Sequence, residues 1–143
     1  MIRVQSEAFD PWGEAAAYQA AHPQWSGKIG AATIFVGTLR DFNQGQTVSS
    51  MTLEHYAGMT EKHLDMVSAE AKARWDIVDT LVIHRYGPLA PNDPIVLVAV
   101  WSAHRDAAFQ ACRYIIDELK TRAPFWKLEQ TGSGNRWVAP EAG

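Results

Sequence analysis

The feature that most constrains the fold is an apolar run, Pro94 to Ala103, that directly precedes an amphipathic segment. Its centre, IVLVAVW (95–101), is continuous and rich in β-branched residues, which predicts a buried strand. The run is far shorter than the ~20 apolar residues that a bilayer-spanning helix needs, so we expect no membrane segment. Residues 106–122 predict the strongest helix of the chain, ended by Pro124. Its apolar face consists of Ala108, Cys112, Ile115 and Leu119.

The remaining elements follow from apolar spacing and from turn-forming residues. Helices are predicted over residues 10–22, where Asp10 and Pro11 suit a helix start, and over residues 59–75. Residues 40–46 read as a loop, and residues 87–94 as turn-forming throughout. Further strands are predicted at 2–5, 30–39, 51–56, 77–84 and 125–129. Because strands and helices do not alternate regularly, the pattern favours an α+β sandwich with a largely antiparallel sheet over a doubly wound fold.

Composition narrows the class of protein. A length of 143 residues suits one domain, so we expect a single domain over residues 1–143. The net charge of −3 disfavours a nucleic-acid binder, which would normally carry a basic stripe. One cysteine excludes an internal disulfide, and residues 1–14 do not resemble a signal peptide. We therefore expect a cytoplasmic protein.

Basic residues at the ends of predicted elements are the candidates for chemistry. The five histidines form neither HxH nor HExxH, Cys112 reads as a core residue, and there is no glycine-rich phosphate loop. Each basic residue alone suits an ordinary solvated position, but strand ends often converge on one edge where ligands bind. Together they suggest an anion site with lysine chemistry, in which Phe125 and Trp126 would partly bury the lysines. The candidates are Arg40, His104, Arg105, Lys120 and Lys127.

Four motifs occur in an order that resembles a known family. They are FVGTLRD (35–41), HRYGPL (84–89), SAHR (102–105) and the pattern K-x-x-x-P-x-W-K-x-E (120–129). In this order they resemble the large, catalytic subunit of molybdopterin synthase, with a similarity that runs from about Gly30 to Trp137. The resemblance implies an α/β hammerhead-like fold with an additional antiparallel β subdomain.

The same resemblance implies an activity and its partners. The family converts cyclic pyranopterin monophosphate to molybdopterin, using sulfur from the C-terminal Gly-Gly thiocarboxylate of a small ubiquitin-like subunit. No metal or other cofactor is implied. The large subunits are expected to form a homodimer within a heterotetramer.

The resemblance also assigns roles to individual residues. Lys120 and Lys127 match the two family lysines beside the incoming thiocarboxylate and the pterin, and are the expected catalytic residues. The expected substrate-binding residues are Thr38, Leu39, Arg40, His104, Arg105, Lys120, Lys127, Leu128 and Glu129. The turn at residues 91–93 departs from the usual Gly-acidic pair of the family, which predicts a changed loop without loss of chemistry.

Two other functions compete with the enzyme. A non-catalytic scaffold could dock a ubiquitin-like sulfur carrier, but docking alone would not need both Lys120 and Lys127. A phosphate-ester hydrolase would need a metal cluster or a nucleophile–base pair, and the sequence contains no pattern for either.

Overall fold

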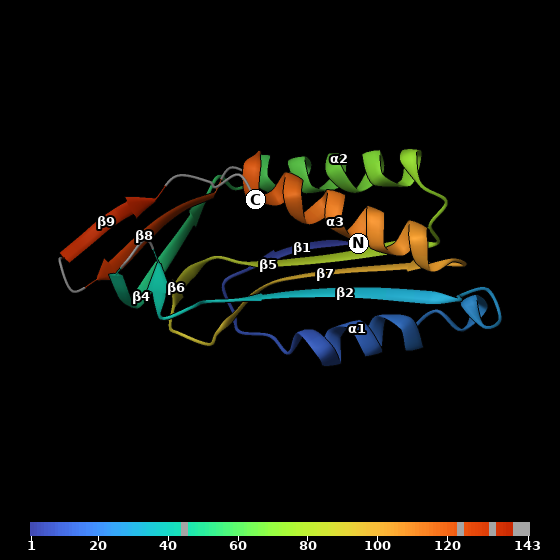
Figure 1. Cartoon of the computed structure of the whole chain (residues 1–143), viewed down its shortest axis with the longest axis horizontal. Helices are drawn as coiled ribbons and strands as arrows, with labels where there is room; N and C mark the ends of the chain where they lie inside the picture. The colour runs from blue at the N-terminus through green and yellow to red at the C-terminus, as the bar shows by residue number, and fades with distance from the viewer. Residues whose placement is uncertain (44–45, 123–124, 132–133, 139–143) are drawn as a thin grey trace.

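Two sheets and three α-helices make up the protein. The computed structural model describes residues 1–43, 46–122, 125–131 and 134–138, with side chains except at 42, 43, 46, 48, 125–131 and 135–138. A four-stranded sheet lies between α1 on one face and α2 and α3 on the other, and a second sheet extends from one end of this sandwich (Figure 1). This arrangement confirms the α+β class and the additional antiparallel sheet.

The four-stranded sheet has the order β1-β5-β7-β2. Its strands are β1 (Ile2–Gln5), β2 (Ala31–Thr38), β5 (Asp79–Arg85) and β7 (Pro94–Ser102). Strands β1 and β5 are parallel and the other pairs antiparallel. The apolar run forms β7, which is buried on both faces: Val98 faces the α2–α3 core, whereas Leu97 belongs to the cluster under α1. Coverage of both faces explains why β7 lacks apolar–polar alternation.

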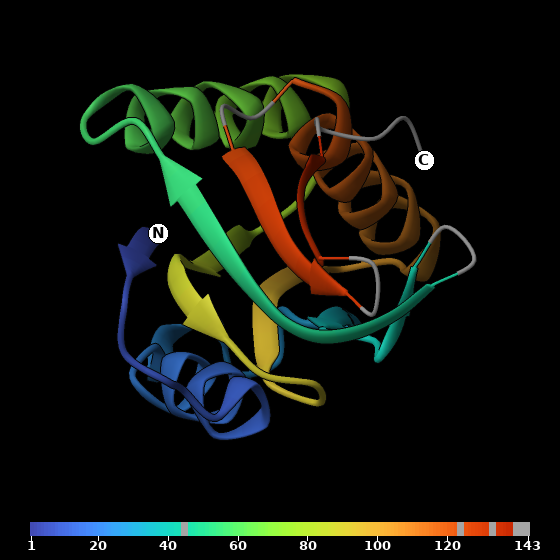
Figure 2. The ribbon, with the colours of Figure 1, turned by 90° about the vertical axis from the view of Figure 1, so that its left-hand side faces the viewer.

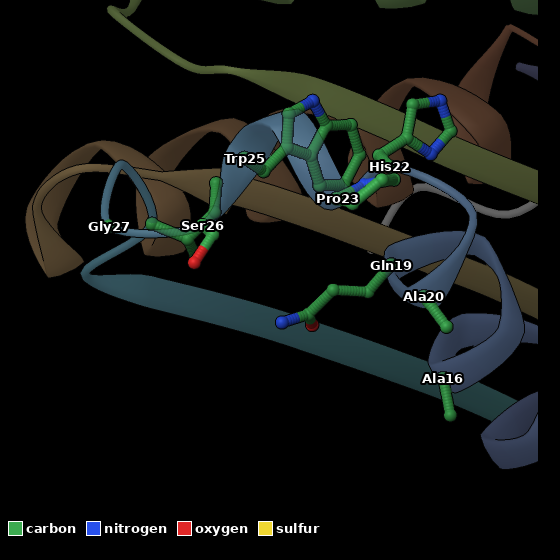
Figure 3. A pocket seen from close by; sticks show the side chains of 9 residues that line it. Ala16, Gln19, Ala20, His22, Pro23, Trp25, Ser26 and Gly27 are labelled. Carbon is green, nitrogen blue, oxygen red and sulfur yellow. The ribbon is translucent and has the colours of Figure 1, made fainter.

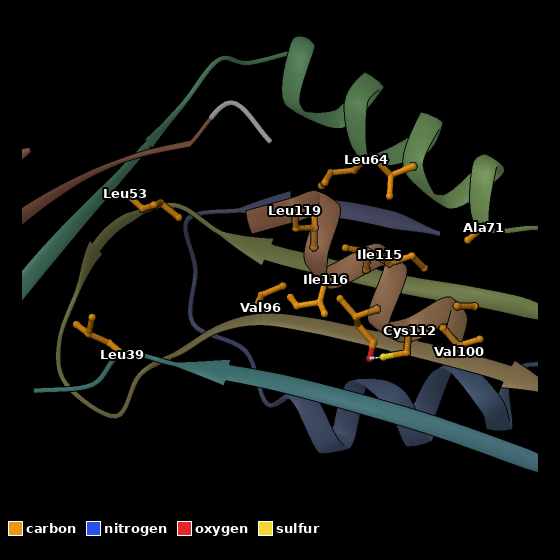
Figure 4. Packing of buried hydrophobic residues seen from close by; sticks show 14 of the residues in the cluster. Leu39, Leu53, Leu64, Ala71, Val96, Val100, Cys112, Ile115, Ile116 and Leu119 are labelled. Atoms are coloured by element: carbon orange, nitrogen blue, oxygen red, sulfur yellow. Dashed lines mark hydrogen bonds between the residues drawn. The ribbon is translucent and has the colours of Figure 1, made fainter. Parts of the chain in front are cut away.

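The helices bury the faces that the sequence predicts. They are α1 (Pro11–Ala20), α2 (Met59–Arg74) and α3 (Arg105–Thr121), with a short 3₁₀ turn, η1 (Pro23–Trp25), after α1. All four residues of the predicted α3 face are buried. Cys112 lies among them, and its Sγ contacts the carbonyl oxygen of Val98 at 3.7 Å, so the prediction of a core cysteine is confirmed (Figure 4).

The second sheet contains β3 (Phe42–Asn43), β4 (Gln46–His55), β6 (Gly87–Leu89), β8 (Phe125–Thr131) and β9 (Gly134–Val138). Strand β4 lies beside β8, and β6 also pairs with β4 (Figure 2). Met51 and Leu53 of β4 are 2% and 1% exposed and belong to the same apolar cluster as Leu119 of α3. The second sheet is thereby packed onto the end of the sandwich.

Two predictions about loops are wrong in part. Residues 87–94 are not turn-forming throughout, because 87–89 form β6 and Pro94 begins β7. Residues 40–46 are not entirely loop, because 42–43 form β3 against the start of β4. Both strands are two or three residues long and exist only where β4 offers a hydrogen-bonding edge, a tertiary condition that local composition does not encode. None of the helices in the described ranges has the length and apolar character that crossing a bilayer requires.

Candidate functional site

Arg40 follows the end of β2 and is exposed, as is Thr38, whereas Leu39 between them is 6% exposed. An extended chain alternates the direction of its side chains, so burial of Leu39 turns its two neighbours outward. Both the N–H and the carbonyl oxygen of Leu39 form hydrogen bonds to the backbone of the turn at residues 90–93. The core and this turn together fix where the Arg40 side chain begins.

Lys120 lies in the last turn of α3 and is exposed. The expectation that this lysine is partly buried is therefore wrong. From α3 the chain continues to β8, which carries Lys127 opposite Leu53, Leu128 opposite Thr52 and Glu129 opposite Met51. The side chains of these three β8 residues, and those of Phe125 and Trp126, lie outside the described residues.

His104 and Arg105 lie at the other end of α3. His104 is the N-cap residue and Arg105 the first helical residue, and both are exposed. They follow the end of β7, where the Gly30 N–H donates to the Ser102 carbonyl oxygen at 3.0 Å. This pair therefore borders the beginning of β2, whereas Arg40 follows the end of the same strand.

One chain does not bring the predicted basic residues together. Lys120 comes fifteen positions after Arg105, and at 1.5 Å per residue the two Cα atoms lie about 22 Å apart along α3. The β2–β7 register pairs Thr38 with Pro94 and Ala31 with Ser102, so Arg40 and His104 also lie at opposite ends. Arg40 lies at the same end of the sheet as Lys120, because α3 begins beyond the end of β7 and runs back along the sheet toward the end of β2 (Figure 1).

The expectation that the strand ends converge on a single edge is therefore wrong within one protomer. It would hold for parallel strands, whose carboxyl ends share an edge. Here β2 and β7 are antiparallel, so their carboxyl ends point in opposite directions.

The basic residues of the candidate site differ from most of the remaining arginines of the chain in their charged partners. Within the described part of the chain, the side chains of Arg40, His104, Arg105 and Lys120 have no hydrogen-bond or ion-pair partner. By contrast, Arg3, Arg85, Arg113 and Arg122 each pair with a carboxylate. Lys28 and Lys62 also lack a described partner, so an unpaired cation is compatible with ligand binding and is not by itself a sign of it.

Other chemistry finds less support in the structure. Burial, the main influence, raises the pKa of the Cys112 thiol to about 11, which disfavours a thiolate nucleophile. Among the described residues, no group of three or more His, Cys, Asp or Glu side chains could hold a metal ion.

A hollow of about 570 Å³ lies beside α1 and η1, on the opposite face of the sheet from α3 (Figures 1 and 3). Gln19, His22 and Trp25 are among its lining residues, and none of the predicted site residues is. The hollow is therefore separate from both groups of basic residues.

Comparison with known proteins identifies the family. The family model described as "MoaE protein" matches residues 4–122. The molybdopterin synthase catalytic subunit of Ralstonia nicotianae is 57% identical over 96% of this chain and 76% of its own length.

Solved structures agree with this assignment. The molybdopterin biosynthesis MoaE protein from Burkholderia ambifaria aligns with a TM-score of 0.83 at 48% identity, over 100% of this chain and 92% of that one. A protein–protein complex of subunits 1 and 2 of the molybdopterin-converting factor from Helicobacter pylori shares the fold, with a TM-score of 0.78 at 18% identity over 99% and 92% of the two chains. The chain therefore belongs to the MoaE family, that of the molybdopterin synthase catalytic subunits.

Proposed function

We propose that this chain is the catalytic subunit of a molybdopterin synthase. It transfers sulfur from the C-terminal thiocarboxylate of a small ubiquitin-like subunit to cyclic pyranopterin monophosphate, producing molybdopterin. Family membership supports the reaction, and the Helicobacter pylori complex of two subunits supports a small protein partner. The cytoplasm is the proposed compartment, and residues 1–143 the proposed single domain.

The observation that carries the assignment of catalytic residues is the position of Lys120. Its ammonium group is exposed at the end of α3 and has no described partner, and the chain leads from there into the strand that bears Lys127. A positive charge at this point can pair with an incoming thiocarboxylate, stabilise negative charge during sulfur transfer and exchange a proton with the reacting groups. Lys127 is proposed as the second catalytic lysine.

The proposed binding site for the precursor is shared between two copies of the chain. A small pterin cannot span the roughly 22 Å between Arg105 and Lys120 of one protomer. A homodimer whose interface places His104 and Arg105 of one copy beside Lys120 and Arg40 of the other would assemble all four groups around one substrate. Arginine can bind the precursor's phosphate with two parallel hydrogen bonds. Thr38, Leu39, Leu128 and Glu129 complete the proposed contacts.

Reconstitution tests the enzyme against the alternative of a docking scaffold. The purified chain is mixed with thiocarboxylated small subunit and precursor, and the dithiolene product is measured. The Lys120→Ala variant should lose about 10²- to 10⁴-fold in turnover, the range for removal of a group that transfers protons in the transition state. Its affinity for the small subunit should change little.

Lys62→Ala is the matched control, because Lys62 is an exposed lysine on α2 without a described partner. It should turn over like wild type. Near-normal turnover of Lys120→Ala would overturn the catalytic assignment. A wild-type chain that binds the small subunit but yields no dithiolene would favour the scaffold.

A further inference from the structure

The turn at residues 90–93 holds the chain at Leu39 with two backbone hydrogen bonds. The Leu39 N–H donates to the Asp93 carbonyl oxygen at 3.0 Å, and the Asn92 N–H donates to the Leu39 carbonyl oxygen at 2.8 Å. Leu39 is also anchored through its buried side chain. The residue directly before Arg40 is thus held both by the core and by this turn.

The turn has its own local order. The Asp93 N–H donates to the Ala90 carbonyl oxygen at 3.0 Å, which closes a four-residue turn. Pro91 occupies the second position, and Asn92 at the third has a φ of 75°. A proline followed by a residue with positive φ is typical of a type II turn, and asparagine tolerates that φ better than most residues.

Side chains fasten the turn to the rest of the fold. The carboxylate oxygen Oδ2 of Asp93 accepts the Ala90 N–H at 2.9 Å and lies 3.4 Å from Nη1 of Arg85. Arg85, at the end of β5, also donates from Nε to the Ser6 carbonyl oxygen at 3.1 Å and from Nη2 to the Pro88 carbonyl oxygen at 3.4 Å. The Arg85 side chain is 14% exposed and the Asp93 side chain 36% exposed, so the ion pair is partly shielded from water.

We propose that Arg85 and Asp93 are positioning residues for precursor binding, acting through Leu39 on Arg40. The ion pair and the turn form a clamp that fixes the backbone at Leu39 and so presents the Arg40 guanidinium to the phosphate of the precursor. The proposal rests on the proposed function, in which Arg40 binds this precursor. Neither clamp residue is proposed to contact the substrate.

Steady-state kinetics of the reconstituted complex test the clamp. Asp93→Ala should raise KM for the precursor about tenfold, part of the loss expected for a charge-assisted hydrogen bond, with kcat within about twofold of wild type. Asp93→Asn retains an oxygen for the Ala90 N–H while removing the charge, so its KM should lie between that of wild type and that of Asp93→Ala. Asp117→Ala is the control, since it removes the carboxylate of an exposed ion pair with Arg113 on α3, and its KM should match wild type.

A double variant separates positioning from general destabilisation. If Asp93 acts through Arg40, adding Asp93→Ala to Arg40→Ala should raise KM no further, because the group that it positions is already absent. Multiplying increases in KM would overturn the proposal. Arg85→Lys and Asp93→Asn keep the test decisive if an alanine variant fails to fold, and an unchanged KM in both would also overturn it.

The same data distinguish this inference from the proposed function. An unchanged KM in Arg40→Ala would refute precursor binding by Arg40 itself. A raised KM in Arg40→Ala with wild-type KM in every Asp93 and Arg85 variant would refute the clamp alone.

Discussion

The two ends of α3 carry basic residues in opposite electrostatic settings. At its carboxyl end, Lys120 interacts favourably with the helix dipole, and the fold alone accounts for a cation there. At its amino end, Arg105 opposes the same dipole, partly offset by Asp106 in the first turn. An arginine in a position that the fold disfavours calls for a binding role more strongly than a lysine in a favoured one. The comparison therefore supports an anion site at the amino end, although the catalytic lysines are proposed at the carboxyl end.

The largest effect expected from this comparison is on precursor binding, and it should arise at both ends of α3. Single changes to alanine at Arg40, His104 or Arg105 should weaken binding of the precursor about tenfold to hundredfold, because each removes a charge-assisted hydrogen bond worth roughly 1.5–3 kcal/mol. Direct titration of each variant with the precursor measures the effect. Arg40 represents the carboxyl end of α3, and His104 and Arg105 represent the amino end. If the variants at only one of these ends lose affinity, the other end does not bind the phosphate.

Mixed dimers then test whether the two ends meet across an interface. One copy carries Lys120→Ala and the other Arg105→Ala, assayed with the precursor below its KM. If each site is built from both copies, a mixed dimer has one site that carries both changes and one site that is wild type. Random mixing makes about half of the dimers mixed, so about a quarter of wild-type activity should return. If each site is built from one chain, mixing should restore nothing.

The smallest expected effect concerns stability, away from both ends of α3. Asp79 begins β5, accepts a 2.7 Å hydrogen bond from the Tyr18 hydroxyl and lies 3.1 Å from Nζ of Lys72. Burial alone would raise the pKa of the Asp79 carboxyl, but hydrogen bonds from Tyr18, the Thr80 N–H and Lys72, with the charge of Lys72, hold it below its usual value. The carboxylate therefore connects α1 and α2 from opposite faces of the sheet.

Asp79→Asn should lower the free energy of unfolding by about 1–2 kcal/mol at pH 7, the scale of a hydrogen bond to a charged group. Because folding lowers this pKa, the stabilisation is present above the unfolded value of ~3.9 and disappears as pH falls through the folded pKa. Urea unfolding at pH 7 and at about pH 3 measures the difference, which should shrink at the lower pH. Turnover at pH 7 should not change. A difference in stability that is equal at both values would show that the charge of Asp79 is not its source.

Short-range patterns predict the long elements of this fold because each carries its own periodicity. The face of α3 that contains Cys112 and Ile115 is buried as its three- and four-residue spacing requires. The short strand at Gly87–Leu89 could not be predicted in this way, since Gly-Pro locally favours a turn and only pairing with Leu53 and its neighbours makes it a strand.

The candidate site likewise has features that local sequence patterns predict and features that depend on tertiary contacts. Its basic residues could be singled out from the sequence, because cations at element ends and the K-x-x-x-P-x-W-K-x-E pattern are local features. The Arg85–Asp93 clamp could not, although Arg85 lies within HRYGPL, because an ion pair across eight residues depends on how β5, β6 and the following turn fold back together.

The sequence by itself determined the identity of the long elements, the family resemblance and the chemical types in the site, because these depend on residue order and on periodicities of a few residues. Only the tertiary structure decided which of those groups lie together. The antiparallel pairing of β2 with β7 and the return of α3 across the sheet place Arg40 with Lys120 and move His104 and Arg105 to the far end. Strand direction and helix length set these separations, and neither is a property of any single motif.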